Sequence, residues 1–181
     1  MPLATRLLAA AALSHALDRM AAEVVARSEG GQGLVLVGIQ RRGVELAERL
    51  AGLITATQGH PPTLGKLDIT LYRDDLQAIG PRPVVGETSL PPDLDGTIVV
   101  IVDDVLYTGR TIRAALDELA DFGRPRRILL CVLVDRGGRE LPIQADIVGT
   151  VVPTEPGDHV NVRVSELDGE DAVDLLRPGA A

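Results

Sequence analysis

Two adjacent carboxylates, Asp103 and Asp104, end the apolar run TIVVIV, and the small, polar loop VLYTGRT follows them. Paired acids can accept hydrogen bonds from a vicinal diol or hold a hard cation such as Mg²⁺. Thr108 to Thr111 offer hydroxyls, consecutive amides and a helix N-terminus, which together suit a phosphate group. A bare Asp-Asp pair is more often a turn or a helix cap. Because strand, acids, loop and helix arrive in one continuous segment, we predict a site for a phosphorylated ribose.

Three other polar loops also follow apolar runs, at residues 40–43, 73–75 and 135–140. The first two contain the arginines Arg41, Arg42 and Arg73. Clustered guanidinium groups would suit a second, more highly charged phosphate. Taken alone, the loop at 40–43 is equally typical of a solvated strand-to-helix loop, and the segment TLYRDD is more typical of a strand end with surface charges. The carboxyl ends of parallel strands meet at one edge of a sheet, so we expect the four loops to share one crevice that accepts a ribose phosphorylated at two places.

The elements that must position these loops alternate along the chain. Apolar runs at 34–39, 66–72, 97–105 and 127–135 predict strands, and amphipathic periodicity predicts helices over about 13–27, 44–54 and 112–119. Unbroken apolar strands are typical of a sheet covered on both faces. The sequence therefore predicts an α/β domain with a mainly parallel sheet. The Gly- and Pro-rich segment 73–96 predicts a long loop of the kind that closes over a site.

Bulk composition sets wider limits. A chain of 181 residues, 45% of them hydrophobic, predicts one domain spanning 1–181. The net charge of -8 argues against binding nucleic acid over the whole surface. The charge is still compatible with a local basic face. The single cysteine, Cys131, lies in the run RILLCVLVD, which predicts a buried thiol and an intracellular protein without an intrachain disulfide.

Other classes of site and segment find little support. LLAAAAL near the N-terminus is similar to a signal-peptide core, but the spacing of Leu13, Leu17 and Met20 predicts an amphipathic helix. We see no run of the roughly 18 to 20 apolar residues that a membrane span needs. The three histidines lack metal-ligand spacing, and neither GxxxxGK[ST] nor GxGxxG follows a strand.

The segment VVIVDDVLYTGRT resembles the signature of the type I phosphoribosyltransferases, which bind 5-phosphoribosyl 1-pyrophosphate (PRPP). LVGIQRRG, DITLYRDDL, FGRP and LVDRGGRELPIQAD narrow the resemblance to the bifunctional family of pyrimidine operon regulators that are also uracil phosphoribosyltransferases. It covers residues 13 to 175, nearly the whole chain. The resemblance implies the type I phosphoribosyltransferase fold, with a mainly parallel sheet flanked by helices, a small hood at about 135–160 and a flexible loop at about 73–96.

The resemblance also implies residue roles. The PRPP-binding residues would be Asp103, Asp104, Val105, Leu106, Tyr107, Thr108, Gly109, Arg110 and Thr111, with the pyrophosphate loop Arg41, Arg42 and Gly43. The catalytic residues would be Asp104, Arg73 and Asp103. Asp135 and Arg136 of the hood would contact the base and Mg²⁺-pyrophosphate. Asp135 is the candidate metal ligand; otherwise Mg²⁺ is bound through PRPP.

By resemblance, the reaction is uracil plus PRPP giving UMP and pyrophosphate, with Mg²⁺ as cofactor, in the cytoplasm. Relatives of this kind bind the leader of their pyrimidine operon messenger RNA when UMP or UTP is present, through a basic face of a homodimer or higher homo-oligomer. Arg19 and Arg139 fit that face. The family pattern is altered at Asp18, Ala22, Gly138 and Gln144, which weakens the expected phosphate contacts.

Three alternatives remain open from the sequence. The enzyme could act on a purine or orotate, because the PRPP motif is shared among these transferases. It could be an RNA-binding regulator that only senses nucleotides, although the arginines and paired acids argue for a working pyrophosphate site. It could be a dedicated uracil salvage phosphoribosyltransferase that has lost RNA binding.

Overall fold

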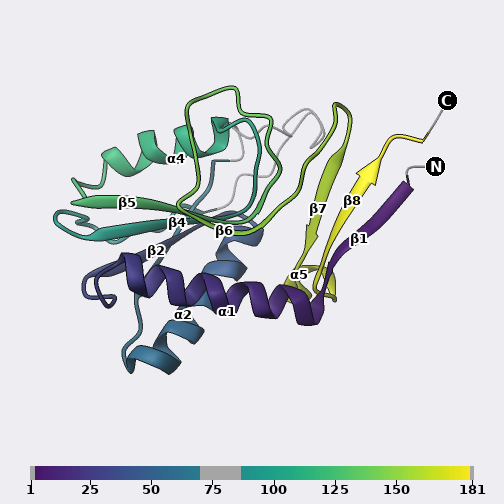
Figure 1. Ribbon diagram of the computed structural model, residues 1–181. Coiled ribbons are helices and arrows are strands. Elements are labelled where there is room, and N and C mark those ends of the chain that lie inside the picture. The colour runs from purple at the N-terminus through teal and green to yellow at the C-terminus, as the bar shows by residue number, and fades with distance from the viewer. Residues whose placement is uncertain (1–2, 70–86, 180–181) are drawn as a thin grey trace.

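A computed structural model describes residues 3–69 and 87–179, and it centres on a parallel five-stranded sheet (Figure 1). The strands lie in the order β3-β2-β4-β5-β6, and every neighbouring pair is parallel. Their bounds are β2 Leu34–Ile39, β3 Thr63–Leu67, β4 Ile98–Leu106, β5 Arg127–Asp135 and β6 Ile147–Val151. The predicted mainly parallel α/β sheet is confirmed.

Helices cover both faces of this sheet (Figure 1). The helices are α1 Ala10–Arg27, α2 Arg42–Gln58 and α4 Arg110–Ala120. Successive strand residues point to opposite faces, so Leu36 and Val100 pack with α1 and α2, whereas Val37 and Ile101 pack with α4. This two-sided burial is why the strands are apolar at almost every position.

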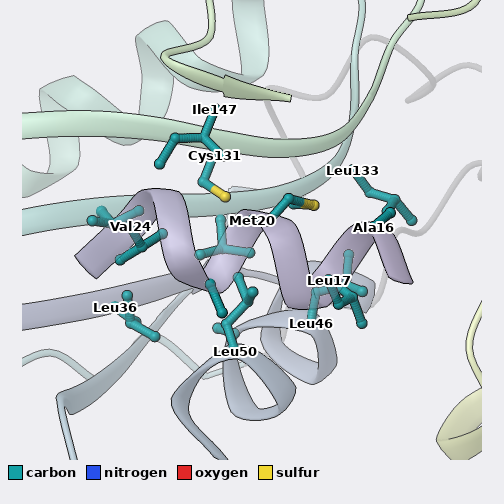
Figure 2. Packing of buried hydrophobic residues seen from close by; sticks show 14 of the residues in the cluster. Ala16, Leu17, Met20, Val24, Leu36, Leu46, Leu50, Cys131, Leu133 and Ile147 are labelled. Atoms are coloured by element: carbon teal, nitrogen blue, oxygen red, sulfur yellow. The ribbon is translucent and has the colours of Figure 1, made fainter. Parts of the chain in front are cut away.

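The larger core cluster lies between the main sheet and the helices α1 and α2. In Figure 2, Met20 of α1 lies among Leu50 of α2 and Cys131 and Leu133 of β5, and all four are fully buried. Each such large apolar side chain contributes about 1.5–3 kcal/mol by its removal from water. The predicted burial of Cys131 and the predicted amphipathic character of α1 are both confirmed. No helix in the described ranges is both long and apolar enough to cross a bilayer.

A second, antiparallel sheet brings the two ends of the chain together (Figure 1). Its order is β1-β8-β7, with bounds β1 Leu3–Ala9, β7 His159–Arg163 and β8 Ala172–Arg177, and the short helix α5 Ser165–Asp168 joins β7 to β8. The sequence does not predict β1, because its apolar residues run straight into α1 without a break in composition. Arg6 of β1 donates to the Asp174 carboxylate of β8 at 2.6 Å, which ties the edge strand down.

The structure bears on two predicted boundaries, those of the strand at 66–72 and of the hood at 135–160. The strand predicted at 66–72 was wrong in its limits: β3 starts at Thr63 and ends at Leu67, in register with Val35 to Ile39 of β2. Residues 70–72 and most of the predicted flexible loop lie outside the described residues. The hood range 135–160 stays a prediction; within it, Ile147–Val151 forms an edge strand of the main sheet.

Candidate functional site

The loops that carry the predicted site residues meet at one edge of the main sheet. β2, β3, β4 and β5 run parallel and are neighbours, so their carboxyl ends lie side by side. Backbone hydrogen bonds join the ends directly: Gln40 N–H donates to Leu67 O at 2.8 Å, and Arg136 N–H donates to Leu106 O at 3.1 Å. The predicted convergence of these loops is therefore confirmed for the described residues.

The paired carboxylates occupy the end of the central strand β4. Asp103 is 5% exposed and its Oδ1 accepts a hydrogen bond from Asp104 N–H at 2.9 Å. The Oδ1 of Asp104 accepts one from Val105 N–H at 2.8 Å, and this side chain is partly exposed. Each carboxylate is thus oriented by the next backbone amide. This arrangement holds both carboxylates in fixed orientations. Groups that accept hydrogen bonds from sugar hydroxyls need such orientations.

The predicted phosphate loop turns directly from β4 into α4. Gly109 has φ +94°, the left-handed region that glycine tolerates, and it stands just before the first helical residue. Thr108 Oγ1 accepts a hydrogen bond from Arg110 N–H at 3.3 Å. The first amides of a helix have no intrahelical acceptor and carry the positive end of its dipole. The loop and the start of α4 therefore have the geometry that suits an anion, and phosphate binding here stays a prediction.

The phosphate loop is fastened to the segment after β5. Thr108 O accepts hydrogen bonds from Glu140 N–H at 3.0 Å and from Leu141 N–H at 3.1 Å. A Cβ on Gly109 would lie 3.0 Å from Cβ of Ile143. The two loops are therefore in contact through backbone hydrogen bonds and through the side chain of Ile143.

Two glycines let the loop after β2 lie against β4. The peptide bond between Gln40 and Arg41 is cis. A Cβ on Gly43 would lie only 2.5 Å from Val102 O, and a Cβ on Gly38 only 2.5 Å from Cα of Val44. Real Cβ atoms do not approach backbone that closely, so glycine is required at both places. Gly43 was predicted as a site residue; Gly38 was not, and its only sequence signal is a glycine inside an apolar strand.

The three predicted phosphate-binding arginines differ in their surroundings. Arg41 is exposed, and its guanidinium makes no hydrogen bond or ion pair with the rest of the described chain. Arg42 forms a bidentate ion pair with Asp168 of α5, at 2.8 and 3.1 Å. Arg73 lies outside the described residues. Asp168 had no sequence signal, because 126 positions separate it from Arg42.

The predicted base-side residues, Asp135 and Arg136, lie at the end of β5. Asp135 accepts hydrogen bonds at both oxygens, from Gly137 N–H at 3.0 Å and from Arg139 Nη2 at 2.6 Å. Arg136 is 7% exposed, and its guanidinium carbon lies 3.8 Å from the ring centroid of Tyr107. A cation stacked on a ring in this way is electrostatically stabilised. The stack joins the end of β5 to the predicted phosphate loop and forms a wall at this edge.

The donor set fits magnesium only in part. Among the residues the structure describes, no group of three or more His, Cys, Asp or Glu side chains could hold a metal ion. The carboxylates of Asp103 and Asp104 are the hard oxygen donors that Mg²⁺ prefers. Asp135 accepts one hydrogen bond at each of its oxygens, which leaves lone pairs on both, and its role as a metal ligand stays a prediction.

Both arginines predicted to bind RNA make intramolecular hydrogen bonds. Arg19 of α1 donates to the carbonyl oxygens of Val148, at 3.1 Å, and Gly149, in the edge strand β6. Arg139 donates to Ile143 O at 2.8 Å and to Tyr107 O at 2.9 Å, besides its bond to Asp135. Their roles toward RNA stay predictions, and the structure gives both side chains a fixed orientation.

A parallel sheet whose central strand ends in paired carboxylates and a Thr-Gly phosphate loop defines the class of type I phosphoribosyltransferases. The family model described as "Phosphoribosyl transferase domain" matches residues 4–167. A hypoxanthine phosphoribosyltransferase of Trypanosoma cruzi has the same fold, with a TM-score of 0.73, 19% identity, and coverage of 96% of this chain and 91% of that one.

Two relatives found by sequence comparison share far more of their residues with this chain than that solved structure does. "Bifunctional protein PyrR" of Thermus thermophilus is 59% identical over 169 residues, covering 93% of each chain. The protein of the same name from Chloroflexus aurantiacus is 55% identical over 175 residues, covering 97% of this chain and 96% of that one. The chain belongs to the bifunctional PyrR family of phosphoribosyltransferases.

Proposed function

We propose that this protein transfers the phosphoribosyl group of PRPP to uracil, forming UMP and pyrophosphate. We propose also that it binds the messenger RNA leader of the pyrimidine biosynthesis operon in response to a uridine nucleotide and so regulates the operon's expression. One observation carries the enzymatic part: the Asp103–Asp104 pair, the phosphate loop at α4 and the loop at Gly43 share one sheet edge. The family membership supports the regulatory part.

The site can hold PRPP at both ends of its ribose. The carboxylates of Asp103 and Asp104 accept hydrogen bonds from the two ribose hydroxyls, and the amides around Gly109 bind the 5-phosphate. Both anchors stand on β4 and α4, whose positions are set by the core. Substrate held at two rigid points presents its C1 carbon in one orientation, which removes much of the entropic barrier to attack.

Bond breaking between C1 and pyrophosphate develops positive charge on the ribose and negative charge on the leaving group. Arg41 and Arg42, in the loop held against β4 by Gly43, stabilise the departing pyrophosphate. Magnesium bound with PRPP would supply further positive charge beside the same oxygens. No covalent nucleophile is needed, because N1 of uracil bonds to C1 as the C1–O bond to pyrophosphate breaks, and the N1 proton leaves to the departing pyrophosphate or to water.

The wall at the end of β5 gives the base its position. Arg136 and Tyr107 stack against each other, and Asp135 is oriented by Arg139. A closed site also keeps water from C1, which otherwise hydrolyses PRPP. The segment 73–96 is the proposed lid, and Arg73 is the proposed catalytic arginine within it.

The enzymatic proposal is tested by comparing several nucleobases as acceptors of the phosphoribosyl group. Purified protein is incubated with PRPP and Mg²⁺ and with uracil, orotate or hypoxanthine in turn, and the nucleotide and pyrophosphate formed are measured. We expect UMP from uracil and no comparable product from the other bases. A preference for hypoxanthine or orotate would contradict uracil as the substrate. As a second test, Asp104→Asn should abolish most turnover while the melting temperature stays unchanged.

The test of the regulatory proposal is filter binding to the pyrimidine operon leader RNA across a salt series. We expect UMP or UTP to tighten binding, and higher salt to weaken it in proportion to the number of phosphate contacts. UMP synthesis without specific RNA binding would instead indicate a dedicated salvage enzyme. The proposed dimer is checked by sedimentation of the same sample. This role places the protein in the cytoplasm, where the operon's RNA is made.

A further inference from the structure

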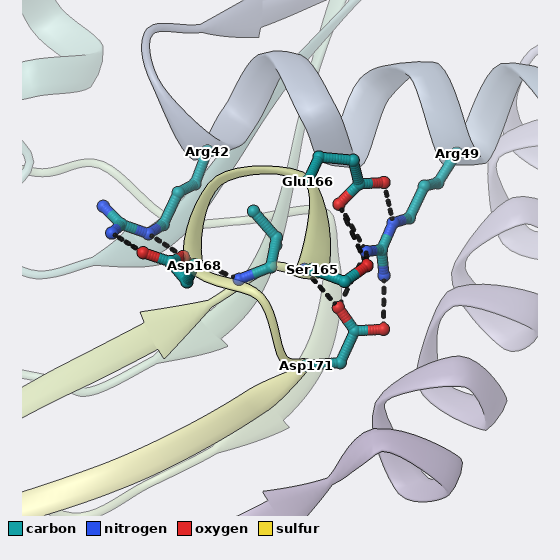
Figure 3. A network of polar contacts seen from close by, with 7 residues as sticks. Arg42, Arg49, Ser165, Glu166, Asp168 and Asp171 are labelled. Carbon is teal, nitrogen blue, oxygen red and sulfur yellow. Dashed lines mark hydrogen bonds and ion pairs between the residues drawn. The ribbon is translucent and has the colours of Figure 1, made fainter.

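One carboxylate outside the predicted site binds an arginine inside it. Arg42 Nε donates to Asp168 Oδ2 at 3.1 Å and Arg42 Nη2 donates to Oδ1 at 2.8 Å, the planar two-bond geometry of an arginine–carboxylate pair (Figure 3). Neither side chain is fully exposed, with 31% and 18% of their side-chain surfaces accessible. Arg42 begins α2, whereas Asp168 ends α5, the short helix that joins β7 to β8 of the second sheet.

Asp168 is itself held in place. Its Oδ2 accepts a second hydrogen bond, from Val164 N–H at 2.8 Å, and its own N–H donates to Val164 O at 2.8 Å. The Arg42 hydrogen bonds hold the pKa of Asp168 below its ordinary value, aided by the Val164 amide. The carboxylate is therefore a fixed anion that cannot turn to follow its partner.

A second arginine fixes the segment that carries Asp168. Arg49 lies two turns along α2 from Arg42, and it donates to both oxygens of Glu166, at 2.8 and 2.6 Å. It also donates to both oxygens of Asp171, at 2.7 and 3.0 Å (Figure 3). The seven-residue spacing puts both arginines on the same side of α2. Arg49 thus anchors residues 166–171, and Asp168 reaches Arg42 from an anchored segment.

We propose that Asp168 is a positioning residue for the transferase reaction: it orients the Arg42 guanidinium so that its remaining donors meet the pyrophosphate of PRPP. Arginine has five N–H donors, and Asp168 takes two of them, on Nε and Nη2. Three donors remain, on Nη1 and Nη2, and two of them, one on each nitrogen, form the end-on edge of the guanidinium. A guanidinium clamped on one edge presents the other without first losing rotamer freedom. The inference rests on the proposed function.

The test compares two charge-neutralising variants on the same short segment. Asp168→Asn keeps one oxygen for the Val164 amide but removes the charge that holds Arg42. Glu166→Gln removes one of the two ion pairs of Arg49; the pair with Asp171 remains and keeps the segment anchored, and Arg42 is untouched. For each variant we would measure KM for PRPP, KM for uracil, the dissociation constant of pyrophosphate with Mg²⁺ by calorimetry, and the melting temperature.

We expect Asp168→Asn to raise KM for PRPP and the pyrophosphate dissociation constant about tenfold, which corresponds to about 1.4 kcal/mol. KM for uracil should stay within about twofold, and Glu166→Gln should leave the ligand constants unchanged at a similar loss of melting temperature. In an Arg42→Ala background, Asp168→Asn should add nothing further, because the two residues act as one unit.

Equal effects of the two variants on pyrophosphate binding would overturn the inference, since Asp168 would then only tether α5 to α2. If Asp168→Asn fails to fold, Asp168→Glu carries the same test, because it keeps the charge but displaces the guanidinium by one methylene. Failure of the unaltered protein to form UMP would count against the proposed function instead. Pyrophosphate binding would still compare the two variants in that case.

Discussion

Replacing Gly43 by alanine would place a methyl group inside the central strand's van der Waals surface. The new Cβ would lie 2.5 Å from Val102 O and 3.3 Å from Cα of Asp103. Both contacts are backbone atoms of β4, which is paired on one side to β2 and on the other to β5. That strand cannot yield, so the loop at 40–43 and the first turn of α2 must move away from it.

The size of the effect follows from two opposing terms. Overpacking a tight contact costs about 1–3 kcal/mol. Alanine is a better helix former than glycine by up to about 1 kcal/mol, and residue 43 is the second of α2. With the full helix gain subtracted, the net loss is about 0–2 kcal/mol, or up to roughly 8 °C in melting temperature for a chain of this size. A displacement of about 1 Å in the pyrophosphate loop can also lower turnover as much as a hundredfold.

Gly52 provides the matched control. It lies in the same helix, is exposed, and has no neighbouring atom within 4 Å of the place that an added methyl group would take. Gly52→Ala should therefore stabilise the protein by about 0.5–1 kcal/mol and leave KM for PRPP unchanged. Urea unfolding and steady-state kinetics of both variants form the assay. If Gly43→Ala were as stable and as active as Gly52→Ala, the close packing of this loop on β4 would be refuted.

Three other outcomes are expected. Cys131 should not react with a thiol reagent in the native protein and should react fully in denaturant, because burial raises the pKa of its thiol to about 12; native labelling at the unfolded rate would contradict this. The hydrogen bonds from Arg49 hold the pKa of Glu166 below its ordinary value of 4.5, so this ion pair stabilises the protein above pH 4.5 and stops doing so as pH falls through the lower folded-state pKa. Glu166→Gln should accordingly flatten the acid limb of a plot of unfolding free energy against pH, and an unchanged limb would argue against the pair. Gly138→His should lower the melting temperature, since its Cβ would lie 2.4 Å from the Tyr107 ring and the residue has φ +75°. A Tyr107→Ala background should relieve the part of the loss that comes from the clash, and no relief would count against this steric account.

The sequence by itself determined β2, β4 and β5 of the five-stranded central sheet, and it placed the candidate site at the end of β4, whereas it missed β6 and misplaced the limits of β3. The runs at 34–39 and 127–135 coincide with β2 and β5, and the run at 97–105 is β4 displaced by one residue. Strands buried on both faces are continuous apolar runs, so their limits are visible without any tertiary information. The paired acids and the phosphate loop are local as well, because a strand, a turn and a helix start lie within one short segment.

Only the tertiary structure decided which distant residues meet. β1 pairs with β8 from the opposite end of the chain, Arg42 meets Asp168 across 126 positions, and Arg139 bonds to Tyr107 O across 32. The need for glycine at position 43 arises from β4, which is remote in sequence. Hydrophobic periodicity records which face of an element is buried and carries nothing about the partner that covers it. The partner is chosen by the packing of the whole chain, and that is where Arg42 acquires its orientation.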